Sequence, residues 1–258
     1  MERVEVLGSW VETFTLASFL ECTTAAVASK RRVLVGNHNI NSLAVLHRGE
    51  PGFASFYAQM DHCFVDGMGV VLLAKLEGRS VTAANRLAVL DWIWPLLAEA
   101  ESRGWHVVHL GSSDLVAARA ARAIRATCPL VRFTSISGFF DASPESADNE
   151  AVVRRITELK PDLLLIGMGM PRQENWIVEN LQRLPECPVI TVGGVVGFLG
   201  DERPTAPRIF GRLGVEWLFR LASEPRRLWR RYLLEPIVLA QPVLSALRSR
   251  VRRHLRTT

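Results

Sequence analysis

The chain has 258 residues, of which 48% are hydrophobic and 22% charged. This composition is typical of a folded globular protein and excludes a disordered, collagen-like or disulfide-scaffold chain. The net charge of +5 is unevenly spread: 13 arginines and three glutamates give residues 203–258 a charge of +10, which leaves −5 for residues 1–202. No apolar run reaches the roughly 18 to 20 residues that cross a bilayer, and the N-terminus is acidic where a secretory signal would be basic.

The four cysteines, Cys22, Cys63, Cys128 and Cys187, are far apart in the sequence. They form no CxxC pair and have no histidine pair nearby, so neither a zinc site nor a disulfide framework is indicated. We therefore expect a cytoplasmic chain with reduced thiols.

Short β-branched runs alternate with longer helical patterns along most of the chain. The predicted strands are residues 4–7, 32–36, 63–65, 106–110, 130–134, 163–166 and 189–192. The predicted helices are residues 16–29, 69–76, 86–102, 114–127, 149–160 and 171–184. Such alternation predicts an α/β fold with a Rossmann-like, mainly parallel sheet covered by helices on both faces. Ligands of such sheets bind at the carboxyl ends of the strands.

The strand signal ends near residue 202, where we place a boundary between an α/β core (1–202) and a basic amphipathic helical appendage (203–258). Arginines of the appendage alternate with Trp and Leu at helical spacing, which gives a cationic face suited to an anionic surface. Anionic lipid attracts such side chains by about 1 kcal/mol each. The same charge would attract nucleic acid, or it could simply keep the C-terminus soluble.

Polar side chains follow the predicted strands at residues 32–36 and 63–65. Asn37 and Asn39 could read the edge of a base or sugar, although an Asn that caps a turn explains them equally well. Asp66 precedes two glycines and a helix, a place where a carboxylate can act as a general base on a ligand near the helix N-terminus. The alternative for Asp66 is a cap for that helix.

Later loops repeat the strand–glycine–helix arrangement. Residues 106–114 lack a complete GxGxxG, and no GxxxxGK[ST] occurs, so neither a dinucleotide site nor a nucleoside-triphosphatase is supported. The stronger signal lies in residues 161–176, where Pro171 starts a helix and Gln173 would face a ligand. Four glycines in residues 193–200 would allow close backbone approach.

Metal-ligand patterns do not occur in the sequence. It contains no Asp-x-Asp and no HExxH, so we expect no metal that bridges a diphosphate. Phosphate charge would have to be met by backbone amides and by arginines, which are concentrated in residues 203–258.

Taken in order, these segments resemble the WecG/TagA/CpsF family, bacterial glycosyltransferase family 26, over about residues 4–234. The resemblance lies in residues 37–43, 66–69, 86 with 91, 138–140, 167–176, 192–194, 213–221 and 224–232.

The resemblance implies an inverting, metal-independent glycosyltransferase without a cofactor. Its donor would be a UDP-sugar and its acceptor a polyprenyl-diphosphate-linked sugar. It would act in the synthesis of a bacterial surface polysaccharide of the exopolysaccharide, capsule, enterobacterial common antigen or teichoic acid type. The enzyme would be cytoplasmic and peripherally associated with the anionic inner face of the plasma membrane. The donor sugar and the formation of a homo-oligomer stay open.

The resemblance also implies roles for single residues. Asp66 would be the base that deprotonates the acceptor hydroxyl. The other matched positions would bind substrate: Asn37, Asn39, Arg86 and Gln173 in the pocket, and Arg220, Arg227 and Arg230 in the appendage that closes over it. The departures from the family include two single positions. Asn37 stands where the family usually has Thr, and Gly197 stands where it frequently has Asp.

Two other functions compete with this hypothesis. A catalytically silent relative could bind the lipid-linked sugar or scaffold a polysaccharide assembly complex. A nucleic-acid-binding protein rests on the charge of residues 203–258 alone, and it would bind with steep salt dependence and show no turnover. We expect no nucleic acid as a partner.

Overall fold

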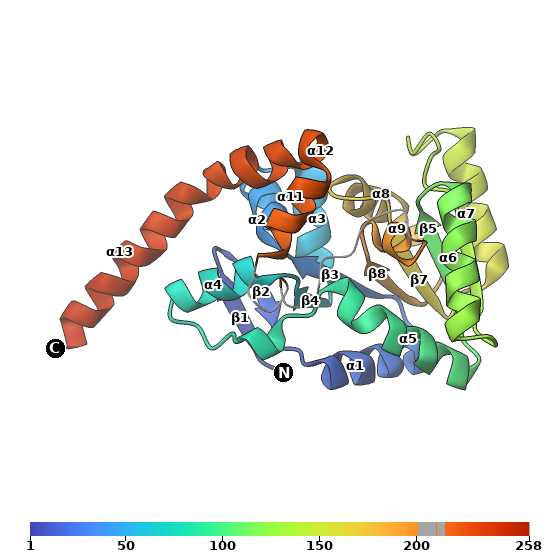
Figure 1. The fold of residues 1–258 in the computed structure, drawn as a ribbon, viewed down its shortest axis with the longest axis horizontal. Helices are drawn as coiled ribbons and strands as arrows, with labels where there is room; N and C mark the ends of the chain where they lie inside the picture. The colour runs from blue at the N-terminus through green and yellow to red at the C-terminus, as the bar shows by residue number, and fades with distance from the viewer. Residues whose placement is uncertain (201–209, 211–214, 258) are drawn as a thin grey trace.

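The computed structural model describes residues 1–200, 210 and 215–257 (Figure 1). Its centre is a six-stranded sheet of order β4-β3-β8-β7-β5-β6, in which every neighbouring pair is parallel. The strands are β3 (Val33–His38), β4 (His62–Val65), β5 (His106–Gly111), β6 (Arg132–Ile136), β7 (Leu163–Gly167) and β8 (Pro188–Thr191). The predicted α/β fold with a Rossmann-like parallel sheet is confirmed.

Helices cover both faces of this sheet because its central strands are apolar on both sides. In β7, Leu163 and Leu165 pack into one core and Leu164 and Ile166 into the other, as the twofold period of a strand requires. The first core is closed by α1 (Leu16–Ser29), α5 (Val89–Arg103), α6 (Asp114–Thr127) and α9 (Val195–Leu199). The second is closed by α2 (Ile40–His47), α3 (Pro51–Gln59), α4 (Met68–Leu76), α7 (Ala147–Leu159) and α8 (Arg172–Asn180).

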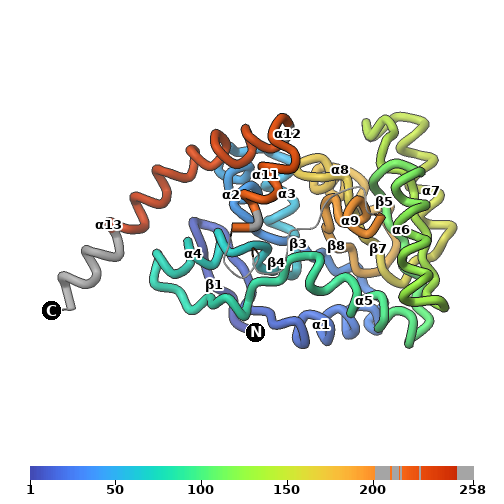
Figure 2. Tube along the Cα trace, viewed as in Figure 1, coloured from blue at the N-terminus to red at the C-terminus, as the bar shows by residue number. Residues whose placement is uncertain are grey.

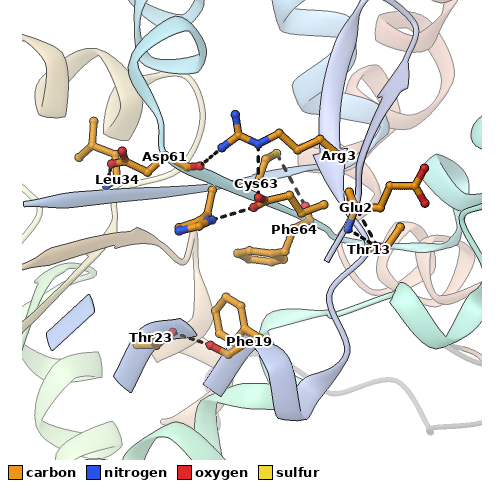
Figure 3. Close-up of polar contacts among 11 residues, drawn as sticks. Glu2, Arg3, Thr13, Phe19, Thr23, Leu34, Asp61, Cys63 and Phe64 are labelled. Carbon is orange, nitrogen blue, oxygen red and sulfur yellow. Dashed lines mark hydrogen bonds and ion pairs between the residues drawn. The ribbon is translucent and has the colours of Figure 1, made fainter. Parts of the chain in front are cut away.

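The first predicted strand lies outside the parallel sheet. It forms β1 (Arg3–Val6) of an antiparallel hairpin with β2 (Ser9–Glu12), a strand that the sequence analysis did not predict. Figure 3 shows Arg3 donating from Nη2 to the carbonyl oxygen of Asp61, at 2.7 Å, while the Asp61 carboxylate accepts from the backbone N–H of Leu34 at 2.8 Å. The hairpin thereby lies beside the edge strand β4.

Several helix boundaries differ from the prediction. The helix expected from residue 86 begins at Val89, because Arg86 continues the chain in extended form beside Val65 and the Leu87 N–H donates to the Val65 carbonyl at 2.8 Å. Helices α2, α3 and α9, of eight, nine and five residues, were not predicted. The 3₁₀ turn η1 (Ala83–Asn85) lies before α5, and the 3₁₀ turn η2 (Leu181–Arg183) directly follows α8.

The C-terminal segment is helical where it is described. It comprises α11 (Glu216–Ser223), α12 (Pro225–Trp229), a π-helical turn η3 (Arg230–Leu234), a 3₁₀ turn η4 (Glu235–Leu239) and α13 (Ala240–Thr257). The η4 turn packs on α2, where Arg48 and Glu235 form an ion pair at 3.2 Å. Figure 2 shows α13 leading away from the sheet. The expected boundary near residue 202 lies outside the described residues.

None of the described helices is both long and apolar enough to cross a bilayer.

Candidate functional site

A pocket of about 290 Å³ opens at the carboxyl ends of the strands. Five strands contribute to its wall through a residue at or just beyond their ends: Asn37, Asp66, Ser112, Gly167 and Val192. It lies between β3, from which the chain runs outward to β4, and β8, which the chain enters from β7 on the other side. The carboxyl ends of the strands are the usual ligand site of an open parallel sheet, as expected from the sequence.

Asp66 is half-buried in the pocket wall, and two amides hold its carboxylate. Asn39 donates from Nδ2 to Oδ2 of Asp66 at 3.1 Å, and Asn37 donates to the same oxygen at 3.4 Å. The N-cap of α4 is Gly67, whose φ of 95° favours glycine, and no side chain caps that position. The described contacts of Asp66 therefore suit a carboxylate presented to a ligand.

Asn39 caps a helix, which is one of the two interpretations that the sequence left open, and it also contacts Asp66. It is the N-cap of α2, where its Oδ1 accepts from the backbone N–H of Ser42 at 3.0 Å. A carboxamide carries an acceptor and a donor at its two ends, so the same side chain can also donate to Asp66. The helix cap thus fixes the direction in which Asn39 presents its N–H groups.

Asn37 is oriented by residues that the sequence analysis did not single out. The Thr191 hydroxyl lies 3.3 Å from Oδ1 of Asn37 and donates to it, which directs the amide nitrogen toward Asp66. The Tyr57 hydroxyl donates to the Asn37 carbonyl at 2.6 Å, and the Tyr57 ring stacks on His38 at 4.3 Å. No local pattern marks Thr191 or Tyr57, because their contacts join positions far apart in the chain.

Replacement of Tyr57 by Phe tests this support. The change removes a buried hydrogen bond to the Asn37 carbonyl, so we expect the free energy of unfolding to fall by about 1–2 kcal/mol. Urea unfolding measures that change. The Thr191→Val variant removes the other contact to Asn37 and is expected to act in the same direction. An unfolding curve identical to that of the wild type would contradict the role of Tyr57.

Gln173 is fully buried in the first turn of α8, and its amide is held at both ends. Its Nε2 donates to Oε1 of Glu174 at 2.7 Å, and its Oε1 accepts from the backbone N–H of Gly169 at 3.2 Å. Glu174 is fully buried too, and burial raises its pKa to about 7. Glu174 falls within residues 167–176, but no role was predicted for it, since burial is not visible in the sequence.

Arg86 does not line the pocket among the described residues. Its guanidinium lies 3.2 Å from the Asp91 carboxylate in an ion pair across the start of α5. The residues that follow it, Ala88, Val89 and Leu90, do form part of the wall. Arg86 is thereby joined to the first turn of α5, which includes the lining residues Val89 and Leu90.

The appendage brings two arginines to the pocket. Arg220 lines it, with its guanidinium 5.0 Å from the centre of the Phe198 ring. Arg230 is exposed over the Trp229 ring and is not a lining residue, whereas the neighbouring Arg231 is. The side chain of Arg227 lies outside the described residues. Arg231 was not predicted as a site residue. It is adjacent to Arg230 in the π-helical turn η3, and the sequence does not show which of the two lines the pocket.

Within the described part of the chain, no three His, Cys, Asp or Glu side chains are grouped so that they could hold a metal. All four cysteines carry free thiols. The polar groups that the pocket offers to an anion are the backbone amides around Gly169 and Gly193 and the guanidinium groups of Arg172, Arg220 and Arg231.

Comparison with known proteins gives two results. The family model described as "Glycosyl transferase WecG/TagA/CpsF family" matches residues 4–254. The chain is 25% identical over 232 residues to N-acetylglucosaminyldiphosphoundecaprenol N-acetyl-beta-D-mannosaminyltransferase of Staphylococcus aureus strain MW2, and equally to that of strain COL. Each alignment covers 88% of this chain and 87% of the relative. With a family match over nearly its whole length, the chain belongs to the WecG/TagA/CpsF family of glycosyltransferases.

Proposed function

We propose that the protein transfers a sugar from a UDP-sugar to a polyprenyl-diphosphate-linked sugar, with inversion and without a metal. The observation that carries this proposal is the carboxylate of Asp66, held by the amides of Asn37 and Asn39 in a pocket that arginines of the appendage also line. A base and a set of anion-binding groups in one pocket are what displacement of a nucleoside diphosphate needs.

In the proposed reaction Asp66 accepts the proton of the acceptor hydroxyl. The hydroxyl oxygen forms the new bond to the anomeric carbon while the bond to the UDP oxygen breaks, and UDP departs with the bonding electrons. A single displacement inverts that carbon. Arg220 and Arg231, together with backbone N–H groups of the glycine loops, would stabilise the charge that develops on the diphosphate.

The acceptor class is proposed from the relatives, whose printed name describes transfer to N-acetylglucosaminyldiphosphoundecaprenol. At 25% identity the donor sugar is not carried over, because one or two hydroxyl contacts decide between related sugars. The product would enter a bacterial surface polysaccharide.

The appendage is proposed to hold the enzyme on the inner face of the plasma membrane. Large apolar side chains on it are exposed, among them Trp217, Trp229, Leu233 and Ile237, and Arg226 and Arg230 are exposed on the same segment. Trp and Arg together suit the interface of an anionic leaflet. A vesicle-sedimentation assay tests this assignment. The protein is expected to sediment with anionic vesicles and not with zwitterionic ones.

A UDP-release assay tests the proposed reaction. The full-length protein is incubated with a panel of UDP-sugars and a polyprenyl-diphosphate-sugar analogue, with and without EDTA. We expect UDP release from one donor, dependent on the acceptor and unaffected by EDTA. Binding of the acceptor without release from any donor would favour the catalytically silent alternative, and loss of release in EDTA would contradict the metal-independent reaction.

A further inference from the structure

His38 is a buried histidine at the end of β3, directly before the Asn39 cap, and it is not a lining residue of the pocket. Both nitrogens of its fully buried ring contact hydroxyls: Nε2 lies 2.7 Å from Oγ of Ser9 in β2, and Nδ1 lies 3.0 Å from Oγ of Ser42 in α2. The ring also stacks on Tyr57, with 4.3 Å between the ring centres and 13° between the planes. Burial lowers the pKa of His38 to about 3, so at neutral pH the ring has one donor and one acceptor nitrogen.

The hydrogen bonds of Ser42 indicate which nitrogen of His38 carries the proton. The Ser42 hydroxyl donates to the Asn39 carbonyl at 2.8 Å and accepts from the Asn39 backbone N–H at 2.8 Å. A hydroxyl has one hydrogen, and the carbonyl contact uses it. Nδ1 must then donate to Ser42, which leaves Nε2 to accept from the Ser9 hydroxyl. With the proton on Nδ1, every polar hydrogen in this group has an acceptor.

The same serine completes the cap that holds Asn39. Oδ1 of Asn39 accepts from the Ser42 N–H at 3.0 Å, so the two residues form a reciprocal capping box at the start of α2. The other end of the Asn39 amide donates to Asp66 at 3.1 Å. The hydrogen bonds of His38 and of this cap therefore form one chain, which begins at Ser9 in the hairpin and ends at the carboxylate of Asp66.

We propose that His38 is a positioning residue: its Nδ1–H fixes the cap of α2 and so the direction in which Asn39 holds the carboxylate of Asp66. Ser9 keeps the proton on Nδ1 and thereby ties the hairpin to the pocket. The inference rests on the proposed function for the role of Asp66 as the base, whereas the chain of hydrogen bonds needs no substrate. Misplacing a reacting group by about 1 Å can lower a rate roughly a hundredfold, so the support of Asp66 matters for transfer.

The position of the ring proton is tested by NMR on the full-length protein with ¹⁵N-labelled histidine. The chain has six histidines, and the signals of His38 are those missing from the spectrum of His38→Gln. At about pH 7 we expect a neutral ring with its proton on Nδ1. A proton on Nε2 would overturn the proposal, because Ser42 would then donate to the ring and could not hold the Asn39 carbonyl.

Two substitutions of His38 separate hydrogen bonding from packing. The amide nitrogen of Asn can occupy the place of Nδ1, so His38→Asn can still donate to Ser42, whereas the longer side chain of Gln carries its amide toward Ser9. We expect kcat for acceptor-dependent UDP release to stay within about threefold of the wild type in His38→Asn and to fall roughly tenfold to a hundredfold in His38→Gln. The KM for the UDP-sugar should change by less than about twofold in both, because the arginines and glycine loops of the pocket are untouched.

A role in packing alone would reverse the order of these variants, since Gln is closer in size to His than Asn is. A kcat in His38→Gln equal to or above that in His38→Asn would therefore overturn the proposal. The matched control is His106→Gln, which alters another buried histidine, at the amino end of β5, whose ring contacts Thr134 and the Leu159 carbonyl. This variant should lower the free energy of unfolding and leave kcat unchanged.

Ser9→Ala gives an independent result if the His38 variants fold poorly, because it leaves the ring in place. We expect kcat to fall about threefold or more, and part of the ring protons to move to Nε2. A kcat and a ring-proton position equal to those of the wild type would overturn the proposal. If the wild type transfers no sugar, the proposed function fails, whereas a proton on Nδ1 that is displaced in Ser9→Ala still supports the chain of hydrogen bonds.

Discussion

Replacement of Asp66 by Asn is expected to lower acceptor-dependent UDP release by about 10²–10⁴-fold, which is the usual contribution of a general base. The variant keeps the size of the side chain and an oxygen that can accept from Asn39, so the pocket should keep its shape. What disappears is the ability to take a proton from the acceptor hydroxyl. We expect kcat to fall while UDP binds as tightly as before, or more tightly, because a negative charge has left the pocket.

The matched control is Asp114→Asn, which changes an exposed aspartate in the first turn of α6. Asp114 follows β5, the next strand along the chain after β4, and is not a lining residue, so this variant should release UDP at the rate of the wild type. Release by Asp66→Asn within about threefold of the wild type would show that another group takes the proton, and the assignment of Asp66 would be wrong.

Replacement of Gly167 by Ala is expected to lower the free energy of unfolding by roughly 2–4 kcal/mol, because the new methyl group has no space. A Cβ at this position would stand 2.5 Å from the carbonyl oxygen of Gly193 and 2.6 Å from Nε2 of His109. Neither neighbour can yield easily, since one is backbone and the other is a fully buried ring. The Gly193 loop would have to move, so UDP binding should weaken as well.

The comparison variant is Gly104→Ala at the C-cap of α5. Here a Cβ would meet nothing within 4 Å, but φ is +68°, a conformation that side chains other than glycine disfavour. We expect a loss of about 1 kcal/mol and unchanged UDP binding. Urea unfolding and titration with UDP compare the two variants. Equal losses in both would show that steric conflict at the pocket is not the dominant effect at Gly167.

The fold class followed from the sequence because it depends on local periodicity. Runs such as residues 163–166 are short and apolar on both faces, which is typical of a strand covered on both sides, and the structure places them in β7. The predicted strand at residues 4–7 belongs to the hairpin β1–β2 and not to the parallel sheet, because four-residue strands carry the same signal in any sheet and the pairing partner is not encoded locally.

Part of the candidate site could also be predicted. Asn37, Asn39, Asp66 and Gln173 each follow or end a predicted strand, or begin the next helix, and the structure brings all four to one pocket. Arg86 was expected in the pocket and is not among the described lining residues; it lies in the extended segment after β4, where its guanidinium pairs with Asp91. The start of α5 at Val89, three residues later than predicted, places Arg86 in that segment.

The sequence by itself determined the parallel α/β architecture, the family and the carboxylate at the end of β4, because strand period, glycine placement and residue chemistry are local properties. Only the tertiary structure decided which groups support that carboxylate. It also decided which arginines of the appendage line the pocket. Thr191 and Tyr57 act through contacts between distant segments, and the environment of Glu174 is set by its burial. Arg231, and not Arg230, lines the pocket, and the adjoining turn η4, which packs on α2, holds η3 in place.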